Sequence, residues 1–428
     1  MSWLTNWNRR KQITVNGSTA GTISDYQMKL TVNQASGTDS AGIVNLGGDV
    51  LTTFNDLRFT KPDGTTLLNY WIESITGTTP NQTAAVWIKL APSPDTIPTS
   101  PGTYSFYIYY NNISATTSTS NGTNTFQLFD DFSGASLDAS KWIAYVGGNY
   151  YSGSSSSVGS GKMNLHIAGN CYACHGDAGF YSVNSFNSSN PIVIKYVSSP
   201  ITKAFFGDWD QGHAWQGGFL LTANTGYPSS PSNNYLSVKD DYNGGFYIST
   251  YDTVTLRTLY SGSIGNITKN VVIKITSTNM IITVNDTEIY NGLHYLGVSD
   301  RHMYFERYAD QRTWIDQNFD NIFIRKYISP EPTFSTISTE ELGITATNMV
   351  INPSENPCRT SFCTIDVSVT WKNNNMTLTS FFTPAITASR GTVSTQSYQS
   401  LDPGASVTLP FTVSNITVGT CTICPNPN

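Results

Sequence analysis

Residues 271–284 are Val-Val-Ile-Lys-Ile-Thr-Ser-Thr-Asn-Met-Ile-Ile-Thr-Val, two short β-branched and aliphatic runs around a polar turn. Such runs, bounded by Gly, Pro, Asn or Ser, are typical of β-strands. Similar runs recur along the chain, for example at 193–197, 218–222 and 246–250, while apolar stripes with the 3.6-residue period of a helix are missing. The sequence therefore predicts an all-β fold.

Two interruptions of this pattern divide the chain. Residues 114–125 are rich in Ser, Thr and Asn, which is typical of a linker. Pro330 and Pro332 interrupt any sheet because proline cannot donate to a β-ladder. We therefore expect three tandem β-sandwiches, which are an N-terminal β-sandwich over 1–126, a larger two-sheet jelly roll over 127–330 and an immunoglobulin-like β-sandwich over 331–428.

Low charge argues against two classes of protein. Charged residues make up 12% of the chain, and 23 Lys and Arg against 29 Asp and Glu give a net charge of −6. No basic stripe is present that could release counterions from a phosphate backbone, and no apolar run approaches the ~20 residues that span a bilayer. We expect no nucleic-acid partner and no membrane span.

Cysteines and sequons indicate an extracellular location. Short spacings between six cysteines are typical of disulfides, although the sequence leaves their pairing open. A chain this rich in Asn, Ser and Thr also forms Asn-x-Ser/Thr sequons by chance, so the use of the nine sequons is an expectation. The cysteines are Cys171, Cys174, Cys358, Cys363, Cys421 and Cys424, and the sequons begin at Asn16, Asn81, Asn112, Asn121, Asn187, Asn266, Asn285, Asn375 and Asn415.

Several motifs resemble known families. Asp56-Leu57-Arg58-Phe59, Tyr70-Trp71-Ile72-Glu73 and Val86-Trp87-Ile88-Lys89 resemble a domain family of unknown function that commonly precedes concanavalin A-like lectin/glucanase (LamG-like) modules. Phe129-Asp130-Asp131-Phe132 and Asp320-Asn321-Ile322-Phe323 resemble the opening and closing strands of such a module. The whole chain is similar to archaeal surface proteins and to archaeal virus attachment or tail-fibre proteins. The resemblance implies glycan recognition at a cell or virion surface.

The stretch 205–218, Phe-Phe-Gly-Asp-Trp-Asp-Gln-Gly-His-Ala-Trp-Gln-Gly-Gly, is the predicted sugar site. Aromatic faces stack on a pyranose ring, while Asp, Gln and His bind its hydroxyls. Core packing of Trp209 and Trp215 is the alternative. The carbohydrate-binding candidates are Asp208, Trp209, Asp210, His213, Trp215 and Tyr242, with Asn243, Phe246 and Arg307 as weaker additions.

A catalytic role has less support in the sequence. Glycoside hydrolysis needs two carboxylates, which catalytic relatives of this class carry on alternate positions of one strand. The middle segment has only Glu288 and Glu306, and neither begins a Glu-x-Asp-x-Glu pattern. We therefore expect a non-catalytic adhesin for host attachment. A glycoside hydrolase using Asp208 and Asp210, or Glu306, and a structural subunit of a filament or virion remain alternatives.

Two sites could hold a cofactor. Cys171-Tyr172-Ala173-Cys174-His175 has the spacing of a c-type haem attachment site, but no apolar helix surrounds it, so a disulfide is favoured over haem or a Cys/His metal site. The resemblance implies a structural calcium at Asp131 and Asp320, with turn capping as the alternative. The expected partners are a cell-surface glycan or glycoprotein, further copies of the chain, or other virion or surface proteins.

Overall fold

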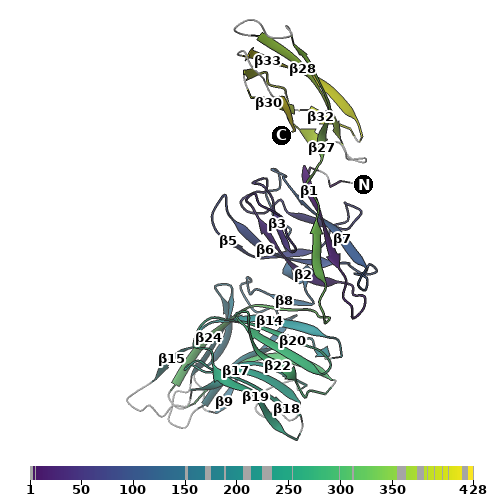
Figure 1. The fold of residues 1–428 in the computed structure, drawn as a ribbon. Coiled ribbons are helices and arrows are strands. Elements are labelled where there is room, and N and C mark those ends of the chain that lie inside the picture. The colour runs from purple at the N-terminus through teal and green to yellow at the C-terminus, as the bar shows by residue number, and fades with distance from the viewer. Residues whose placement is uncertain are drawn as a thin grey trace. The chain divides into compact units, whose positions relative to one another are not determined.

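The computed structural model divides into two compact units, Met1–Asn121 with Pro332–Asn428, and Gly122–Glu331 (Figure 1). Almost all regular structure is strand, which confirms the all-β prediction. No helix in the described part of the chain is long and apolar enough to cross a membrane. The structure describes residues 3–4, 6–149, 153–168, 175–187, 189–205, 214–223, 234–252, 254–297, 299–310, 313–353, 363–373, 380–382, 384–389, 391–397, 399–402, 404–416 and 423–427.

An N-terminal β-sandwich forms the first part of the first unit. One sheet has the order β25 (Thr333–Ile337), β1 (Arg9–Asn16), β7 (Thr103–Tyr110) and β4 (Arg58–Thr60), with β26 (Glu341–Leu342) also beside β1. The other sheet has the order β3 (Ile43–Asn45), β2 (Tyr26–Asn33), β6 (Thr83–Leu90) and β5 (Tyr70–Thr76). Alternate apolar residues of these strands, such as Ile13, Leu30 and Phe106, are fully buried.

Two of these strands come from beyond the middle unit. The sequence pattern assigns residues 331–428 to the C-terminal domain, whereas β25 and β26 pair with β1 of the N-terminal sheet. The Arg10 guanidinium, which is 3% exposed, fixes this edge. It donates to Glu341 Oε2 from Nε and Nη2, at 2.9 and 2.7 Å, and lies 4.1 Å from the ring centroids of both Trp3 and Tyr107. These contacts account for the return of the chain to its first strand.

The C-terminal strands form one larger sheet and two strand pairs. Alternate residues of two strands face a small core, as the alternating sequence predicts. They are Val367, Val369 and Trp371 on β28 (Cys363–Asn373), and Phe411 and Val413 on β33 (Ser406–Ile416). The sheet order is β27 (Ile344–Pro353), β28 (Cys363–Asn373), β33 (Ser406–Ile416) and β31 (Thr392–Val393); β29 (Ser380–Phe382) pairs with β32 (Gln399–Leu401), and β30 (Pro384–Ala388) pairs with β34 (Ile423–Pro427).

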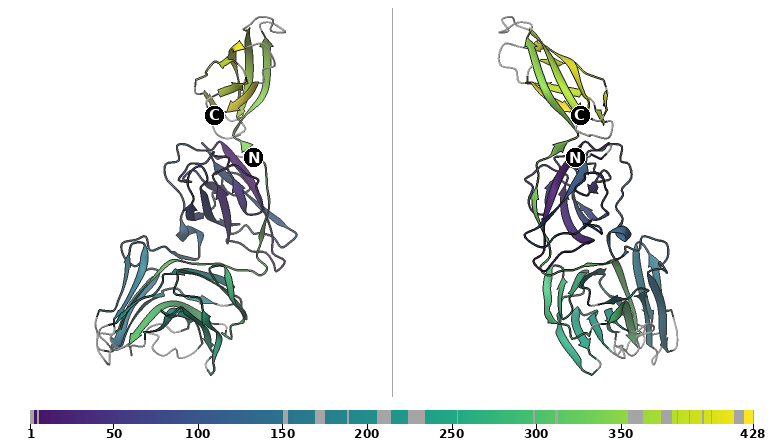
Figure 2. Two further views of the ribbon diagram at one scale, coloured as in Figure 1. Left: turned by 60° about the vertical axis from the view of Figure 1, so that its left-hand side comes forward. Right: turned by 90° about the vertical axis from the view of Figure 1, so that its right-hand side faces the viewer.

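The second unit begins with the short helix α1 (Gly122–Thr125) and contains two large antiparallel sheets, seen from two sides in Figure 2. The nine-stranded sheet has the order β10 (Ser155–Gly159), β11 (Lys162–Ala168), β24 (Thr313–Lys326), β14 (Ile192–Ser198), β20 (Lys269–Ile275), β21 (Asn279–Val284) and β22 (Thr287–Leu293), with β15 (Thr202–Phe205) and β8 (Leu128–Asp130) also beside β24. The eight-stranded sheet has the order β19 (Leu256–Ser263), β18 (Gly245–Tyr251), β17 (Tyr235–Asp240), β16 (Ala214–Thr222), β23 (Asp300–Asp310), β12 (His175–Ser182) and β9 (Trp142–Asn149), with β13 (Phe186–Asn187) beside β23.

Aromatic side chains from both sheets form the core of the jelly roll. Phe305 on β23 is fully buried, with ring centroids 5.0 Å from Phe180 and 5.1 Å from Phe319. Tyr196 packs on Phe305 edge to face at 5.2 Å. Because side chains alternate along a strand, burial of Phe305 places Tyr304 and Glu306 on the opposite face of the eight-stranded sheet.

Candidate functional site

One row of residues crosses the eight-stranded sheet on the face opposite the core. In order, Tyr145, Gly179, Glu306, Gly218 and Lys239 are each directly paired with the next, on β9, β12, β23, β16 and β17. Directly paired residues of antiparallel strands project their side chains on the same face. We call these five residues the Glu306 row. The pairing places one carboxylate between two residues that have no side chain.

The two glycines allow longer side chains to reach Glu306. A Cβ at Gly179 would lie 2.7 Å from Tyr145 Oη and 2.5 Å from the carbonyl oxygen of Phe305. Tyr145 Oη donates to Glu306 Oε2 at 3.2 Å, and on the other side Lys239 Nζ lies 3.9 Å from Glu306 Oε1. The Glu306 side chain is 20% exposed. Its carboxylate is therefore contacted from both sides, and the side chain as a whole is partly buried.

The surroundings of Glu306 favour its protonated form. Burial raises the pKa of Glu306, the ammonium of Lys239 and the hydrogen bond from Tyr145 lower it, and the negative charge of Asp177 raises it again. Asp177 is 6% exposed and lies two residues before Gly179 on β12, hence on the same face. Two carboxyl groups therefore occupy neighbouring rows of this sheet.

Tyrosine side chains lie beside the Glu306 row. Tyr181 and Tyr304 are directly paired, and their rings stack with centroids 4.8 Å apart and planes 16° apart. Tyr304 is fully buried, and Tyr181 lies over it with partial exposure. The rings of Tyr145 and Tyr181 are 6.4 Å apart. The face thus combines a carboxylate, an ammonium and aromatic rings, which are the groups that bind sugar hydroxyls and pyranose faces.

Most of the predicted sugar-binding residues lie outside the described part of the chain, namely Asp208, Trp209, Asp210 and His213. The backbone of Trp215 pairs with Tyr308 on β23, and its side chain also lies outside the described residues. Tyr242 follows β17 and is partly buried against the core, with Lys203 Nζ 3.8 Å from its ring centroid. These residues remain predictions.

Two of the weaker candidates do not lie on a surface. Phe246 is 2% exposed and Arg307 is 1% exposed, and both face the core of the jelly roll. The interpretation of these two residues as surface groups is wrong. Alternation along β18 buries Phe246, and on β23 the inward position of Phe305 and the outward position of Glu306 turn Arg307 inward. Asn243 is exposed in the turn after β17.

The sequence reasoning named Glu306 only as a minor catalytic alternative and missed its neighbours. Tyr145, Gly179, Gly218, Lys239 and Asp177 come from four strands that are up to 94 residues apart in the sequence, from 145 to 239. The alternation of Met303 and Phe305 with polar residues was the available signal for the outward position of Glu306. The residues that surround Glu306 follow only from the pairing register of the neighbouring strands.

Asp131 and Asp320, for which the resemblance implies calcium, take part in local turns. Asp131 Oδ1 accepts the Ser133 N–H at 3.2 Å, and Asp320 Oδ1 accepts the Asn321 N–H at 2.6 Å. Burial raises the pKa of Asp320, and the charge of Asp131 raises it further. Among the described residues, no group of three or more His, Cys, Asp or Glu side chains could hold a metal ion. Two carboxylates are few for calcium, which takes six to eight oxygen ligands, so calcium stays a prediction.

The cysteine predictions are also not tested. Cys171, Cys174, Cys358 and Cys421 lie outside the described residues, while the backbones of Cys363 and Cys424 belong to β28 and β34. His175 begins β12, and its side chain lies outside the described part. Disulfides, and haem or a metal at residues 171–175, therefore stay predictions.

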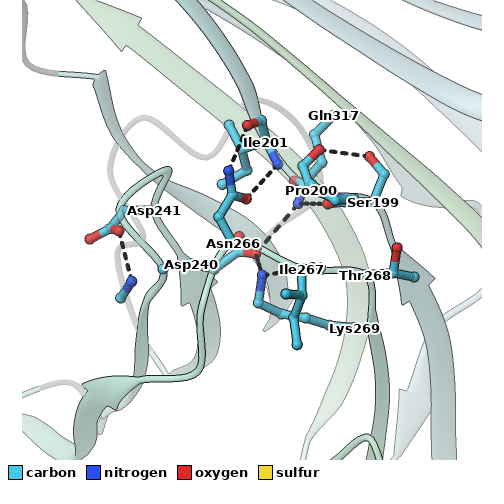
Figure 3. Close-up of polar contacts among 12 residues, drawn as sticks. Ser199, Pro200, Ile201, Asp240, Asp241, Asn266, Ile267, Thr268, Lys269 and Gln317 are labelled. Carbon is cyan, nitrogen blue, oxygen red and sulfur yellow. Dashed lines mark hydrogen bonds and ion pairs between the residues drawn. The ribbon is translucent and has the colours of Figure 1, made fainter.

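The described sequons differ in the environment of the asparagine. Asn81 and Asn121 are exposed, whereas Asn112 is 7% exposed. Asn266 uses its amide to hold a neighbouring loop, since Nδ2 donates to the Ile201 carbonyl at 2.9 Å and Oδ1 accepts the Ile201 N–H at 2.7 Å (Figure 3). A glycan at Asn266 would interrupt this pair of hydrogen bonds. The other sequons begin at Asn16, Asn187 and Asn285, with the Asn375 residue and the Asn415 side chain outside the described part.

Comparison with known proteins identifies one domain family within the chain. Residues 53–145 match the model of a domain of unknown function, DUF2341, so the chain contains this domain. No curated protein sequence matches the chain. Similar solved structures include a β-glucanase of Bacillus licheniformis (10% identity, TM-score 0.36, 47% of this chain and 98% of that chain), LamAcat from Zobellia galactanivorans (13%, 0.35, 47% and 100%) and the carbohydrate recognition domain of Emp47p (8%, 0.32, 46% and 94%).

Proposed function

We propose that this chain is an extracellular carbohydrate-binding protein that binds a glycan at the Glu306 row. The arrangement of the row carries the proposal, because a partly buried carboxylate lies between two glycines, with an ammonium on one side and a phenol on the other. The glycines let the Tyr145 side chain approach Glu306 closely, since a Cβ at Gly179 would lie 2.7 Å from Tyr145 Oη. Aromatic rings and polar groups side by side on one sheet face suit a sugar ring that carries hydroxyl groups.

Each group of the row has a defined task in this proposal. The Glu306 carboxylate accepts hydrogen bonds from neighbouring sugar hydroxyls, and Lys239 Nζ donates to a hydroxyl or ring oxygen. Tyr181 offers the face or edge of its ring to the apolar side of the sugar. Tyr145 orients the carboxylate through its hydroxyl, 3.2 Å from Oε2.

Glycoside hydrolysis is a second candidate function, favoured by the electrostatics of Glu306. A carboxyl group with a raised pKa can protonate a glycosidic oxygen, while a second carboxylate acts as nucleophile or base. Glu306 and Asp177 would take these roles. We favour binding without cleavage because Asp177 is 6% exposed and therefore poorly accessible to a sugar carbon or a water molecule.

We further propose that binding serves attachment at a cell or virion surface. Low charge, nine sequons and six cysteines support an extracellular location. A structural subunit of an extracellular filament is the alternative, and it would need no sugar site. Self-assembly of the purified chain would distinguish a structural subunit from an attachment protein.

The test is binding of the full chain to a panel of cell-envelope glycans. We expect saturable binding that is lost in Glu306→Ala and weakened in Lys239→Met. Glu288→Ala is the matched control, because Glu288 is an exposed glutamate on β22 of the other sheet. No binding by the unmodified chain, or unchanged binding in Glu306→Ala, would contradict the proposal. Sugar release that disappears in both Glu306→Gln and Asp177→Asn would favour the hydrolase.

A further inference from the structure

A charged cluster lies inside the jelly roll, separate from the Glu306 row. Asp240, Lys269, Arg307 and Gln317 are 4%, 0%, 1% and 1% exposed. Figure 3 shows Lys269 pointing at Asp240. A lysine ammonium is almost never fully buried unless it is paired, because removing it from water costs free energy. The cluster therefore needs a specific explanation.

The Lys269 ammonium and the Asp240 carboxyl group are in direct contact. Lys269 Nζ lies 2.9 Å from Asp240 Oδ2 and donates to the Ile267 carbonyl at 3.3 Å. The Arg307 guanidinium donates to Asp240 Oδ1 from Nη2 and to the Asp240 carbonyl oxygen from Nη1 at 2.8 Å. Arg307 is held in turn by Gln317 Oε1, 2.5 Å from its Nε. The amine, the carboxyl group and a fixed cation thus meet at one point.

The two residues belong to different sheets. Asp240 ends β17 of the eight-stranded sheet, and Lys269 begins β20 of the nine-stranded sheet. A covalent bond between them would join the two layers of the jelly roll across its core. It would close a loop of the chain from 240 to 269.

We propose that Lys269 and Asp240 form an intramolecular isopeptide bond. A proton passes from Lys269 Nζ to Asp240 Oδ2 along the 2.9 Å contact, and the neutral amine attacks the carboxyl carbon Cγ. The Nζ–Cγ bond forms and the Cγ–Oδ2 bond breaks. Oδ2 leaves as water with the transferred proton and a second proton from Nζ. One amide and one water result from the ammonium and the carboxylate, with no oxidant or other reactant.

Three features of the surroundings support this reaction. The fold holds the amine beside the carboxyl group, which removes the entropy cost of bringing them together. The Arg307 guanidinium at Oδ1 stabilises the negative charge that develops on this oxygen during attack. A small cavity lined by Asp240, Lys269, Tyr196 and Ser198 has room for about one water molecule, which is the leaving group.

Burial also favours the product. Asp240 and Lys269 as an ion pair keep two charges out of water, and the amide is neutral. The aromatic rings of Phe246 and Phe319 line the same cavity and limit the water that could hydrolyse the bond. The less buried pair of Lys274 and Glu331 offers the contrast, since its Nζ–Oε1 distance of 2.8 Å is as short but its side chains are 31% and 26% exposed.

Mass spectrometry of the intact full chain tests the proposal. The chain is made in a host without N-glycosylation, and its cysteines are reduced and alkylated. We expect a mass one water below that calculated for the reduced and alkylated sequence, no tryptic cleavage after Lys269, and a branched peptide that joins residues 240 and 269. Lys269→Arg should restore the full mass, and peptides containing Lys274 should remain unlinked.

The mass of the unmodified chain is sufficient to test for the isopeptide bond, so the test does not depend on whether Lys269→Arg folds. A mass equal to the sequence mass, with separate peptides for Asp240 and Lys269, would overturn the proposal. Loss of water located at any other pair of residues would overturn it too. Neither result would bear on glycan binding at the Glu306 row.

Discussion

Substitution of Lys239 by methionine tests whether the charge of Lys239 holds Glu306 in place. Lys239 Nζ is 3.9 Å from Glu306 Oε1, and the two side chains are 26% and 20% exposed. At about 4 Å the attraction is about 4 kcal/mol for a pair near a protein surface before desolvation, whereas exposed pairs contribute about 0.2–1 kcal/mol. Partial burial places this pair between these limits. We expect Lys239→Met to lower the free energy of unfolding of the middle unit by about 1–2 kcal/mol at pH 7.

The effect of Lys239→Met should depend on pH. Because the folded state raises the pKa of Glu306, protonated Glu306 stabilises the fold at low pH, and this contribution is lost as pH rises through the raised pKa. The Lys239 ammonium offsets that loss. Its removal raises the pKa further, so the variant should lose stability more steeply with rising pH and match the unmodified chain more closely in acid.

Hydrogen exchange of β17 and β23 peptides in urea, at several pH values, measures these differences in the full chain. Lys61→Met is the control, since Lys61 Nζ lies 2.8 Å from Asp95 Oδ2 with side chains 21% and 37% exposed in the first unit. It should leave the exchange of β17 and β23 unchanged. An equal loss at pH 4 and pH 7 in Lys239→Met would refute the electrostatic reasoning and indicate lost packing of the lysine stem.

Three further substitutions test the packing of the sheets. Phe305→Ala should lower the free energy of unfolding by about 3–5 kcal/mol, because it leaves a cavity at the centre of the jelly-roll core. Thermal unfolding measures this change, and a loss below about 1 kcal/mol would contradict the packing described for Phe305. Gly218→Ala should lower the free energy of unfolding by about 1–3 kcal/mol or more, since Gly218 has a φ of +147° and its added Cβ would lie 2.5 Å from the Val238 carbonyl oxygen. Unchanged unfolding in urea would show that β16 can move to make room for the Cβ. Arg10→Met should lower the free energy of unfolding by about 2–4 kcal/mol, because it removes contacts with two aromatic rings and the hydrogen bonds to Glu341. We expect faster hydrogen exchange at residues 339–343, and unchanged exchange there would count against this role of Arg10.

The fold was largely predictable because strand signals are local. Alternation at 365–371 gave the burial of Val367, Val369 and Trp371 directly. The return of β25 to the N-terminal sheet could not be predicted in this way. It depends on pairing between β1 and residues more than 300 positions later, and local patterns carry no information on such partners.

The candidate site was less predictable for the same reason. The aromatic stretch 205–218 drew attention because its residues are adjacent in the sequence. The Glu306 row, in contrast, brings together residues from five strands, and two of its members are glycines that matter through their lack of a side chain. Arg307 shows the limit of residue type as a guide, because a charged residue beside Glu306 faces the core.

The return of the chain to β1 also determines how the molecule would respond to tension between its two ends. Arg9 pairs with Leu342 and Arg10 pairs with Glu341 in the sheet. A force that pulls the two termini apart therefore acts first on these backbone pairs and on the ion pairs of Arg9 and Arg10, before it acts on residues 11–340. The segment from β1 to β26, which includes the jelly roll, carries none of this force as long as these backbone pairs stay formed. A tethered molecule could therefore carry mechanical load without stretching the sheet that contains Glu306.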